Sequence, residues 1–575
     1  MELQDSRRLT GPNLLWNKPG AVVEVTVAGE RSDDAVRVWE QQARLILDAV
    51  GWSGEQTCVR TFQDGAALAI SAPIDALYAA TEINEWAWES ACAVLDGRAA
   101  NFSSRGLPSI EESAQRLRHA IEQERKPAWL ALQEAASDHG VTFVSDDDEL
   151  SVGTGRGSLT WPVHSLPSSR DIDWSVVHDV PMAMVTGTNG KTTTVRLVAA
   201  MAAAAGRVAG TTSSDWIRVG DEILQRGDYS GPGGARTVLR DRRVDLAILE
   251  TARGGMLRRG LAVPRADVVA ITNVAEDHLG EFGVCDLDAL IDAKWIVTRA
   301  AGPGSRVVLN ADDDALVERA SQLDTQITWC SLSSAACHCS RPAAHCFIDN
   351  NAVTYSDGTT RRRLVAVEDM PFAFGGAARH NIANALTAVA IATALGIPWD
   401  AIVRALREFT SGGDDNPGRS NLFDIGGVRM LVDFAHNPHG LEALLDLAAA
   451  LPARRRLVIL GQGGDRGDDA IRQLTSVAWA ARPDRIILKD LPAYLRGRER
   501  REVPDFMKQV LIDLGAPEDV ISQADSEIEA VRGALRWAQP DDLLLLVVHE
   551  SRNDVLKLLE ALRKSAWTPG KALPA

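Results

Sequence analysis

The sequence predicts an α/β protein built from several domains. Its 575 residues exceed what one hydrophobic core supports, and at roughly 100–200 residues per domain about three to four domains are expected. From residue 175 onward, short apolar runs alternate with helical patterns, which is typical of a parallel sheet covered by helices. One run is followed by the glycine-rich stretch GTNGKTTT and then by a helical pattern, the arrangement of a phosphate-binding loop.

The composition argues against a nucleic-acid-binding protein, a membrane-spanning protein and a secreted protein. The formal net charge is −17, so a large basic surface for nucleic acid is not expected. The longest apolar runs, such as LVAAMAAAA, are too short to span a bilayer, and the opening residues show no signal-peptide core. Seven cysteines, an odd number, favour a reducing compartment. We therefore expect a cytoplasmic protein that binds neither nucleic acid nor membrane.

Residues 1–170 are predicted to form an α+β N-terminal domain. The strand pattern AVVEVTVAG precedes the helical pattern DDAVRVWEQQARLILDAV, and a strand pair around CVRTFQDGAALAISAP precedes a helix through EWAWESACAVL. Ser109 and Glu112 have the spacing of a capping box for the next helix. The Gly- and Ser-rich stretch VGTGRGSLTWPVHSLPSS is expected to be a linker or a turn.

Residues 171–415 are predicted to form a central parallel α/β domain, with strands at AMVTG, VDLAILET, DVVAITNV and SRVVLNADD. Residues 331–370 are expected to be irregular, and a helix is expected at HNIANALTAVAIATALG. The alternation restarts after Pro417 in MLVDFAHNP, RLVIL, RIILKD and LLLLVVHE. That restart predicts a third, C-terminal α/β domain over residues 416–575.

The glycine-rich loop is the first candidate site. Its glycines let backbone amides surround phosphate oxygens, its lysine neutralises phosphate charge, and the hydroxyl after the lysine can bind Mg²⁺. The longer phosphate-loop spacing needs a glycine where this chain has Val185, so the loop is a shortened form. The nucleotide-binding residues expected here are Gly187, Thr188, Asn189, Gly190, Lys191, Thr192 and Thr193.

Further candidates stand at or after the predicted strand ends. Glu250 ends one apolar strand, Asp277 and His278 follow the next, and Lys294 comes sixteen residues later in a helical pattern. A carboxylate and an imidazole beside a bound triphosphate suit a second metal site. Taken singly, each has a simpler interpretation as a satisfied strand-end carboxylate, a core histidine or a solvated lysine. Their order along the chain favours the site.

The ordered motifs resemble the Mur ligase family of ATP-dependent amide-forming ligases. They are GTNGKTT, the strand-end glutamate, TN-x₃-DH, a helix with AK, LNADD, HNIANAL, NPGR, VDFAHNP and GQGGDR, and together they cover about residues 175–575. The segments ETARGGMLRRGL, SGPGGAR, NPGRSNLFD and LRGR, with the N-terminal RLTGPN, look like the cyanophycin synthetase branch. That branch carries an ATP-grasp domain where this chain has only VGTGRGSLTWP, so we expect that domain to be missing.

The resemblance implies that ATP phosphorylates an acceptor carboxylate and that the amine of an amino acid displaces phosphate from the acyl phosphate, releasing ADP and phosphate. Lys191 and Thr192 match the γ-phosphate and Mg²⁺ site, and Glu250 and His278 match the ligands of a second metal. Lys294 matches a lysine that is carbamylated in many members, and its carbamylation here is a hypothesis. The catalytic residues implied are Lys191, Glu250, His278 and Lys294, and the metal ligands implied are Thr192, Glu250, His278 and Lys294.

Other motif residues have implied roles at the nucleotide and at the acceptor. Asn381 is expected to contact the base, while Arg419 and Asp433 would reach ATP only when the C-terminal domain closes. The acceptor's carboxylate is expected at arginines of the motif segments, which are equally compatible with solvated helix arginines. These candidate substrate residues are Arg236, Arg253 and Arg258.

Several alternatives stay open at this stage. The acceptor is expected to be an acidic, peptide-like molecule carrying an aspartyl side chain; a peptidoglycan precursor or a glutamyl chain is the alternative, as is a subunit that needs a separate ATP-grasp enzyme. The amino acid added is not fixed by the sequence. Homo-oligomers occur among related enzymes, and nothing in the sequence sets the state. A zinc site is not expected among Cys330, Cys337, Cys339, Cys346, His338 and His345, because no CxxC pair is present.

Overall fold

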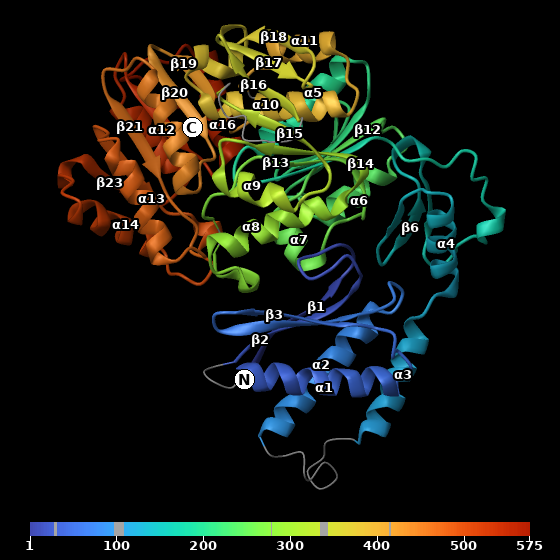
Figure 1. Ribbon diagram of the computed structural model, residues 1–575. Helices are drawn as coiled ribbons and strands as arrows, with labels where there is room; N and C mark the ends of the chain where they lie inside the picture. The colour runs from blue at the N-terminus through green and yellow to red at the C-terminus, as the bar shows by residue number, and fades with distance from the viewer. Residues whose placement is uncertain (28–31, 97–108, 278, 334–342, 413–415, 575) are drawn as a thin grey trace.

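The computed structural model describes residues 1–575 apart from 28–31, 97–108, 278, 334–342, 413–415 and 575. Figure 1 shows an N-terminal domain in blue, a small teal unit beside it, a central domain in green and yellow, and a C-terminal domain in orange and red. The α/β class expected from the sequence is confirmed by the sheets and helices of the described residues. No helix in that part of the chain is long and apolar enough to cross a membrane.

The N-terminal domain is an antiparallel sheet with three helices packed against it. Its strand order is β1-β2-β4-β3, and a cluster of apolar side chains around the fully buried Trp39 fills the space between sheet and helices. The predicted capping box is confirmed, because the Ser109 side chain accepts from the Glu112 amide and the Glu112 side chain accepts from the Ser109 amide. The elements are β1 (Glu2–Leu9), β2 (Gly20–Thr26), α1 (Ser32–Ala49), β3 (Thr57–Phe62), β4 (Gly65–Ser71), α2 (Leu77–Leu95) and α3 (Ile110–Glu124).

Residues 152–169, expected to be a linker or a turn, run through a folded unit and include a one-turn helix, so the linker alternative is wrong and the turn alternative holds for part of the stretch. A short helix packs on a three-stranded sheet, and the glycines lie where this unit touches the central domain. Gly155 has φ +55°, and a Cβ there would lie 2.5 Å from the backbone oxygen of Val244. The glycines therefore permit close packing rather than flexibility. The elements are α4 (Pro127–Asp138), β5 (Phe143–Ser145), β6 (Glu149–Val152), the one-turn helix η3 (Gly155–Gly157) and β7 (Leu159–Pro162).

The central domain contains an eleven-stranded sheet in the order β11-β10-β9-β12-β8-β13-β14-β15-β16-β17-β18. The strands from β9 to β16 in this order are parallel, and antiparallel strands close both edges. Strand β8 lies between β12 and β13, so the loop that follows it is flanked by both neighbouring strand ends. The strands are β8 (Met182–Thr186), β9 (Ala209–Thr212), β10 (Trp216–Val219), β11 (Glu222–Arg226), β12 (Leu246–Glu250), β13 (Ala266–Ile271), β14 (Ala301–Asn310), β15 (Gln326–Ser331), β16 (Ala344–Asp349), β17 (Ala352–Ser356) and β18 (Arg361–Ala366).

Residues 331–370 are not irregular throughout, which corrects the sequence prediction. Strands β16 and β17 form a hairpin, and its two turn residues, Asn350 and Asn351, have φ values of 46° and 56°. Two consecutive residues with positive φ match the tight turn that suits the twist of paired strands, and asparagine tolerates that conformation. The Asn-Asn pair was the signal that the sequence interpretation missed.

Helices cover both faces of the central sheet. One face packs against α5, α10 and α11, and the other packs against α6, α7, α8 and α9 (Figure 1). The phosphate-binding loop runs directly into α5, whose first residue is Lys191. The helices are α5 (Lys191–Ala204), α6 (Pro232–Arg240), α7 (Arg253–Arg259), α8 (Leu287–Trp295), α9 (Asp314–Arg319), α10 (Arg379–Ala394) and α11 (Trp399–Glu408).

The C-terminal domain has a second, mostly parallel sheet in the order β19-β20-β24-β21-β22-β23; among its described strands, β19 and β20 pair antiparallel and the other pairs are parallel. Apolar clusters lie on both faces of this sheet under the helices. The elements are β19 (Asn421–Ile425), β20 (Val428–Asp433), α12 (Pro438–Ala450), β21 (Arg456–Leu460), α13 (Asp468–Ala480), β22 (Arg485–Lys489), α14 (Glu502–Asp513), β23 (Ile521–Ala524), α15 (Glu527–Trp537), β24 (Leu543–Val547) and α16 (Arg552–Lys564).

A buried ion pair fixes the loop that follows β24. Lys489 and Glu527 are both fully buried and form a short hydrogen-bonded pair, and Lys489 Nζ also donates to the Val547 oxygen at 2.6 Å. The Glu527 carboxylate accepts from the backbone amides of His549 and Ser551, each at 2.7 Å. The pair therefore holds the turn between β24 and α16, which faces the central domain.

Replacing Lys489 with methionine should destabilise the C-terminal domain by about 3–5 kcal/mol, because the Glu527 charge would stay buried without its partner. Thermal or denaturant unfolding measures the change. Lys508→Met, on α14, is the control and should change stability by no more than about 0.5 kcal/mol. A stability close to that of the unmodified protein would show that the pair does not hold this turn.

Candidate functional site

The glycine-rich loop turns tightly at two positions. Gly187 has φ +143° and Gly190 has φ +86°, and a Cβ at either position would lie about 2 Å from a neighbouring side-chain oxygen, 1.9 Å from Thr272 Oγ1 and 2.1 Å from Asn384 Oδ1. Only glycine meets both the backbone and the space requirements here. The turn leads into the N-terminus of α5, where the first amides of a helix have no partner within the helix, which is an anion-binding arrangement.

Residues after β13 hold the loop in this form. The Asn189 amide donates to Asn273 Oδ1 at 2.9 Å, and the Asn189 oxygen accepts from Thr272 Oγ1 at 2.6 Å and from Asn273 Nδ2 at 3.0 Å. Lys191 Nζ donates to the oxygens of Gly187 and Thr188 at 3.0 and 2.9 Å. The loop is thus preorganised around its lysine, and the motif residue Asn273 braces the loop.

Thr192 and Glu250 provide adjacent oxygen atoms at the start of α5. Thr192 Oγ1 donates to Glu250 Oε2 at 2.8 Å, and Glu250 is 3% exposed. Burial raises the pKa of Glu250, and the charge of Lys191 and the Thr192 hydrogen bond oppose that rise. A hydroxyl and a buried carboxylate fit Mg²⁺, which takes oxygen ligands from one or two protein groups and completes its shell with phosphate and water.

Lys294 lies on α8 with its side chain buried, 4% exposed. It has no hydrogen-bond or ion-pair partner within the described part of the chain. The pKa of Lys294 is lowered to about 7, mainly by burial and in smaller part by the charges of Lys191 and Arg253, while the charge of Asp277 opposes the shift. A lysine with this pKa is largely an uncharged amine at slightly alkaline pH. His278, the other expected metal ligand, lies outside the described residues.

A cavity of about 320 Å³ lies beside the loop and is lined on one side by α10. Asn381 lines it, but its Nδ2 donates to the Phe372 oxygen at 2.9 Å, so the amide nitrogen is already committed. On the C-terminal side, the Asp433 carboxylate accepts from the Ser420 amide at 2.7 Å and from the Ala435 amide at 2.8 Å. Asp433 and Arg419 both line the cavity, so the residues expected to meet nucleotide lie together.

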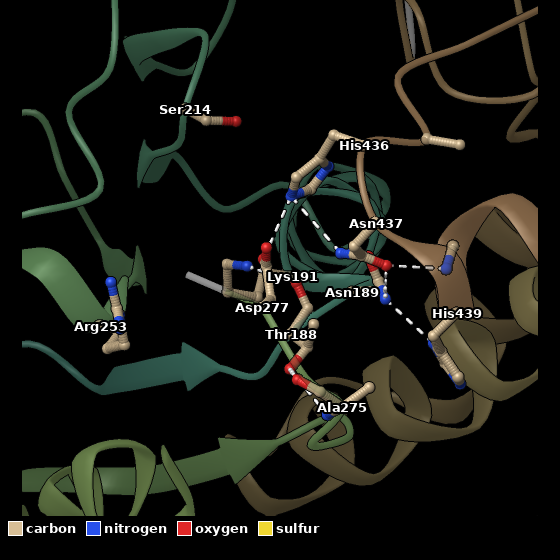
Figure 2. Close-up of polar contacts among 12 residues, drawn as sticks. Thr188, Asn189, Lys191, Ser214, Arg253, Ala275, Asp277, His436, Asn437 and His439 are labelled. Atoms are coloured by element: carbon tan, nitrogen blue, oxygen red, sulfur yellow. Dashed lines mark hydrogen bonds and ion pairs between the residues drawn. The ribbon is translucent and has the colours of Figure 1, made fainter. Parts of the chain in front are cut away.

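The C-terminal domain meets the loop directly (Figure 2). Asn189 and Asn437 exchange two side-chain amide hydrogen bonds, each 3.1 Å, and Asn189 Nδ2 lies 3.0 Å from His439 Nδ1. His436 Nε2 lies 3.3 Å from one oxygen of Asp277, and an Arg466 nitrogen lies 3.0 Å from the other. The domains are therefore docked in a closed arrangement around the loop.

A second carboxylate links the two domains on the other side of the loop. Asp215 is buried and pairs with Arg196 of α5 and, at 2.5 Å, with Arg552 of the C-terminal domain. Burial by itself raises the pKa of Asp215, but the neighbouring arginines outweigh burial and hold its pKa below the ordinary value. Arg419 stacks on Phe434 and lies 3.4 Å from Ser214 Oγ, next to the same carboxylate.

Between the domains runs a groove of about 1140 Å³ that includes the loop, Glu250 and Lys294. The three arginines expected at the acceptor differ in position. Arg253 lines the groove but pairs with Glu281 at 2.5 Å, and Arg258 lines it with no hydrogen-bond or ion-pair partner among the described residues. Arg236 is not among the residues that line the groove; its Nη2 donates to Thr10 Oγ1 at 3.0 Å.

Sequence reasoning named the loop and strand-end residues but missed several that complete the site. His436 and Asn437 stand in the motif VDFAHNP, and Arg466 stands in GQGGDR, so their motifs carried a signal. Asp215 and Arg552 belong to no motif quoted for the site. In the cysteine segment, Cys330 and Cys346 are buried on the neighbouring strands β15 and β16. Residues 334–342 lie outside the described part of the chain. Among the described residues, no group of three or more His, Cys, Asp or Glu side chains is placed to bind a metal ion.

The fold and site define a nucleotide-binding α/β protein in which a second α/β domain closes over a phosphate loop. Family models match both domains: the Mur ligase middle domain matches residues 185–392, and the Mur ligase glutamate ligase domain matches residues 418–547. The chain belongs to the Mur ligase family, a class of ATP-dependent ligases that form carbon–nitrogen bonds and use Mg²⁺.

Curated relatives agree with this assignment. The cyanophycin synthetase of Synechocystis sp. is 34% identical over 388 residues, which are 66% of this chain and 44% of that protein. A UDP-N-acetylmuramoyl-L-alanyl-D-glutamate–2,6-diaminopimelate ligase of Geobacter metallireducens is 28% identical and matches 64% of this chain and 73% of that protein. The chain thus spans less than half the length of the cyanophycin synthetases it matches. Among solved structures, Escherichia coli FolC in complex with ADP gives a TM-score of 0.49 at 20% identity, covering 67% of this chain and 90% of that chain.

Replacing Lys191 with alanine should reduce ATP turnover at least about 100-fold, because the loop loses the cation that neutralises phosphate charge. ADP release measured at saturating ATP tests this. Lys564→Ala, an exposed position at the end of α16, is the matched control and should leave the rate unchanged. Full turnover by Lys191→Ala would remove the loop from the reaction.

Proposed function

We propose that the protein is an ATP-dependent amide ligase that phosphorylates an acceptor carboxylate and joins an amino acid to it through the amine. One observation carries this proposal: the phosphate loop, the Thr192 and Glu250 oxygens and the buried Lys294 all border one groove between the two domains. A ligase needs this convergence, because the γ-phosphate, the acceptor and the amine must meet where water is largely excluded.

The proposed order of events follows from charge. Both the acceptor carboxylate and the γ-phosphate are anionic, so cations must screen them before they can approach. Lys191 provides one such cation at the loop, and a bound Mg²⁺ held by Thr192 and Glu250 would supply further screening of the phosphates. A carboxylate oxygen attacks the γ-phosphorus and ADP leaves. The uncharged amine then attacks the acyl carbon, phosphate leaves as the amide bond forms, and the nitrogen gives up one proton to the departing phosphate or to water.

We further propose that Lys294 is carbamylated. Its amine, with a pKa of about 7 caused mainly by burial, has the uncharged form that attacks carbon dioxide. The amine nitrogen bonds to the carbon of CO₂ and loses a proton to water, which leaves a carboxylate on the side chain. That carboxylate would offset Lys191 and Arg253, the two cations that now lower the pKa of Lys294, and would give a second metal site an oxygen ligand.

Two walls of the groove suit the two organic substrates. On the central wall, Arg258 is exposed to the groove and unpaired among the described residues, which suits the carboxylate of an acidic peptide with an aspartyl side chain. On the C-terminal wall, Glu550 lines the groove, and its Oε2 is buried without a hydrogen-bond partner in the described structure. A buried carboxylate oxygen without a partner favours a cationic group, so we assign the amine donor to that wall.

Amine- and acceptor-dependent ADP release tests the function. The protein is incubated with ATP, Mg²⁺, aspartyl peptides as acceptors and each of the twenty amino acids as donors. The masses of the products are measured by mass spectrometry. ADP release together with the mass of one added residue is expected. If ADP appears only with a glutamyl chain or a peptidoglycan precursor, the acceptor proposal is wrong. Turnover that appears only on adding an ATP-grasp enzyme would favour a partner-dependent subunit.

Lys294→Ala should lose most ligase activity, about 100-fold or more, and should regain part of it in millimolar acetate, which supplies the missing carboxylate. In the unmodified protein, activity should fall as the pH drops below about 7, where Lys294 becomes protonated, and should rise with added bicarbonate. Acetate should not affect Lys191→Ala, which lacks a different group. Unchanged activity of Lys294→Ala would exclude Lys294 from the mechanism.

A further inference from the structure

Helix α7 carries the acceptor-side arginines yet is weak by itself. It is seven residues long, with the sequence RGGMLRR, and contains Gly254 and Gly255. Each glycine in a helix interior costs about 1 kcal/mol relative to alanine, and isolated helices shorter than about 12 residues are marginal in water. The position of Arg253 and Arg258 in the groove therefore depends on contacts from outside the helix.

The N-terminal segment Arg7–Asn13 supplies those contacts at the carboxyl end of α7 (Figure 1). Arg7 Nε donates to the Leu257 oxygen at 3.2 Å, and the Thr10 amide donates to the Arg259 oxygen at 2.8 Å. The carbonyls of the last helical turn have no partner within a helix, so these donors satisfy groups that would otherwise be left unpaired. Directly after the helix, the Leu261 amide donates to the Pro12 oxygen at 2.7 Å.

The two backbones approach so closely that side chains do not fit between them. A Cβ on Gly11 would lie 2.2 Å from the Leu261 oxygen. Gly260 has φ +86°, and a Cβ there would lie 2.6 Å from the Gly11 oxygen. The glycine in the motif RLTGPN and the glycine that ends α7 are therefore required by the same contact.

Side chains connect this backbone contact to the central domain and to the N-terminal domain. Thr10 Oγ1 donates to the Arg259 oxygen at 3.2 Å and accepts from Arg236 Nη2 at 3.0 Å, so α6 and α7 are held by one hydroxyl. Arg7 pairs with Glu24 of β2 at 2.6 Å, which fixes the segment to the N-terminal sheet. Arg236 thus serves this junction, which explains why it does not line the groove.

We propose that the segment Arg7–Asn13 is a positioning element of the acceptor subsite: it ends and anchors α7, and so sets where Arg253 and Arg258 stand in the groove. None of its seven residues is among the described residues that line the groove, so it acts through α7. The inference rests on the proposed function only in naming the acceptor as the substrate that α7 binds.

Kinetics of two substitutions test this role. Thr10→Val removes the hydroxyl and keeps the shape, and Gly11→Ala places a methyl group against the Leu261 oxygen. With ATP and an aspartyl peptide as the acceptor, we expect the acceptor KM to rise about threefold for Thr10→Val and about tenfold for Gly11→Ala. The KM for ATP and kcat should stay within about twofold, because the phosphate loop is not touched.

Thr57→Val is the matched control. Its hydroxyl bonds Glu40 and Arg44 inside the same N-terminal domain, away from α7, so its acceptor KM should not change. Equal rises in the KM for ATP and for acceptor, or an unchanged acceptor KM in folded Gly11→Ala, would overturn the positioning role.

Hydrogen exchange separates this inference from the proposed function. Gly11→Ala should speed amide exchange in residues 253–261 and leave residues 187–194 as they are, whichever acceptor the enzyme uses. If the unmodified protein does not turn over aspartyl peptides, the proposed acceptor fails and exchange decides the anchoring. Unchanged exchange across residues 253–261 would overturn the anchoring even if the ligase activity is confirmed.

Discussion

Two buried or half-buried carboxylates of the central domain, Asp215 and Asp277, hold the C-terminal domain against the phosphate loop. Each receives cationic or imidazole groups from the other domain: Arg552 at Asp215, and His436 with Arg466 at Asp277. Asp215 is 7% exposed, so water and salt screen its pair with Arg552 much less than they screen an exposed pair. Residues of both domains line the groove between them, and every proposed step takes place inside it.

The chemistry of the loop was readable from the sequence because its requirements are local. Gly187, Gly190 and Lys191 lie within five residues: the backbone geometry demands the two glycines, and the expected role of Lys191 follows from its charge beside them. The strand-end Glu250 was also found, since parallel strands bring their carboxyl ends to one edge of the sheet. The structure adds the reason for Asn273, which braces the loop from the neighbouring strand end.

What the sequence did not reveal depends on contacts between distant segments. Asp215 and Arg552 are more than three hundred residues apart, and neither has a local pattern that points to the other. Arg236 was assigned to the acceptor because it stands in SGPGGAR, a segment that resembles the cyanophycin synthetase branch, yet its partner is Thr10 of the N-terminal segment. The linker alternative failed for a related reason. Gly155 packs closely against the Val244 oxygen of the central domain, and composition alone cannot distinguish such packing from flexibility.

The groove therefore has one part that the central sheet positions and two parts that depend on contacts from other segments of the chain. The phosphate loop is built by the central sheet itself, whereas α7 is ended by the N-terminal segment, and the turn carrying Glu550 and Arg552 is fixed by the buried Glu527 of the C-terminal domain. ATP-dependent ligases of this family all bind nucleotide, and they differ in the acceptor and the amine that they join. The contacts that position these two segments come from the N-terminal segment and from the buried core of the C-terminal domain, so each segment can be altered without disturbing the phosphate loop.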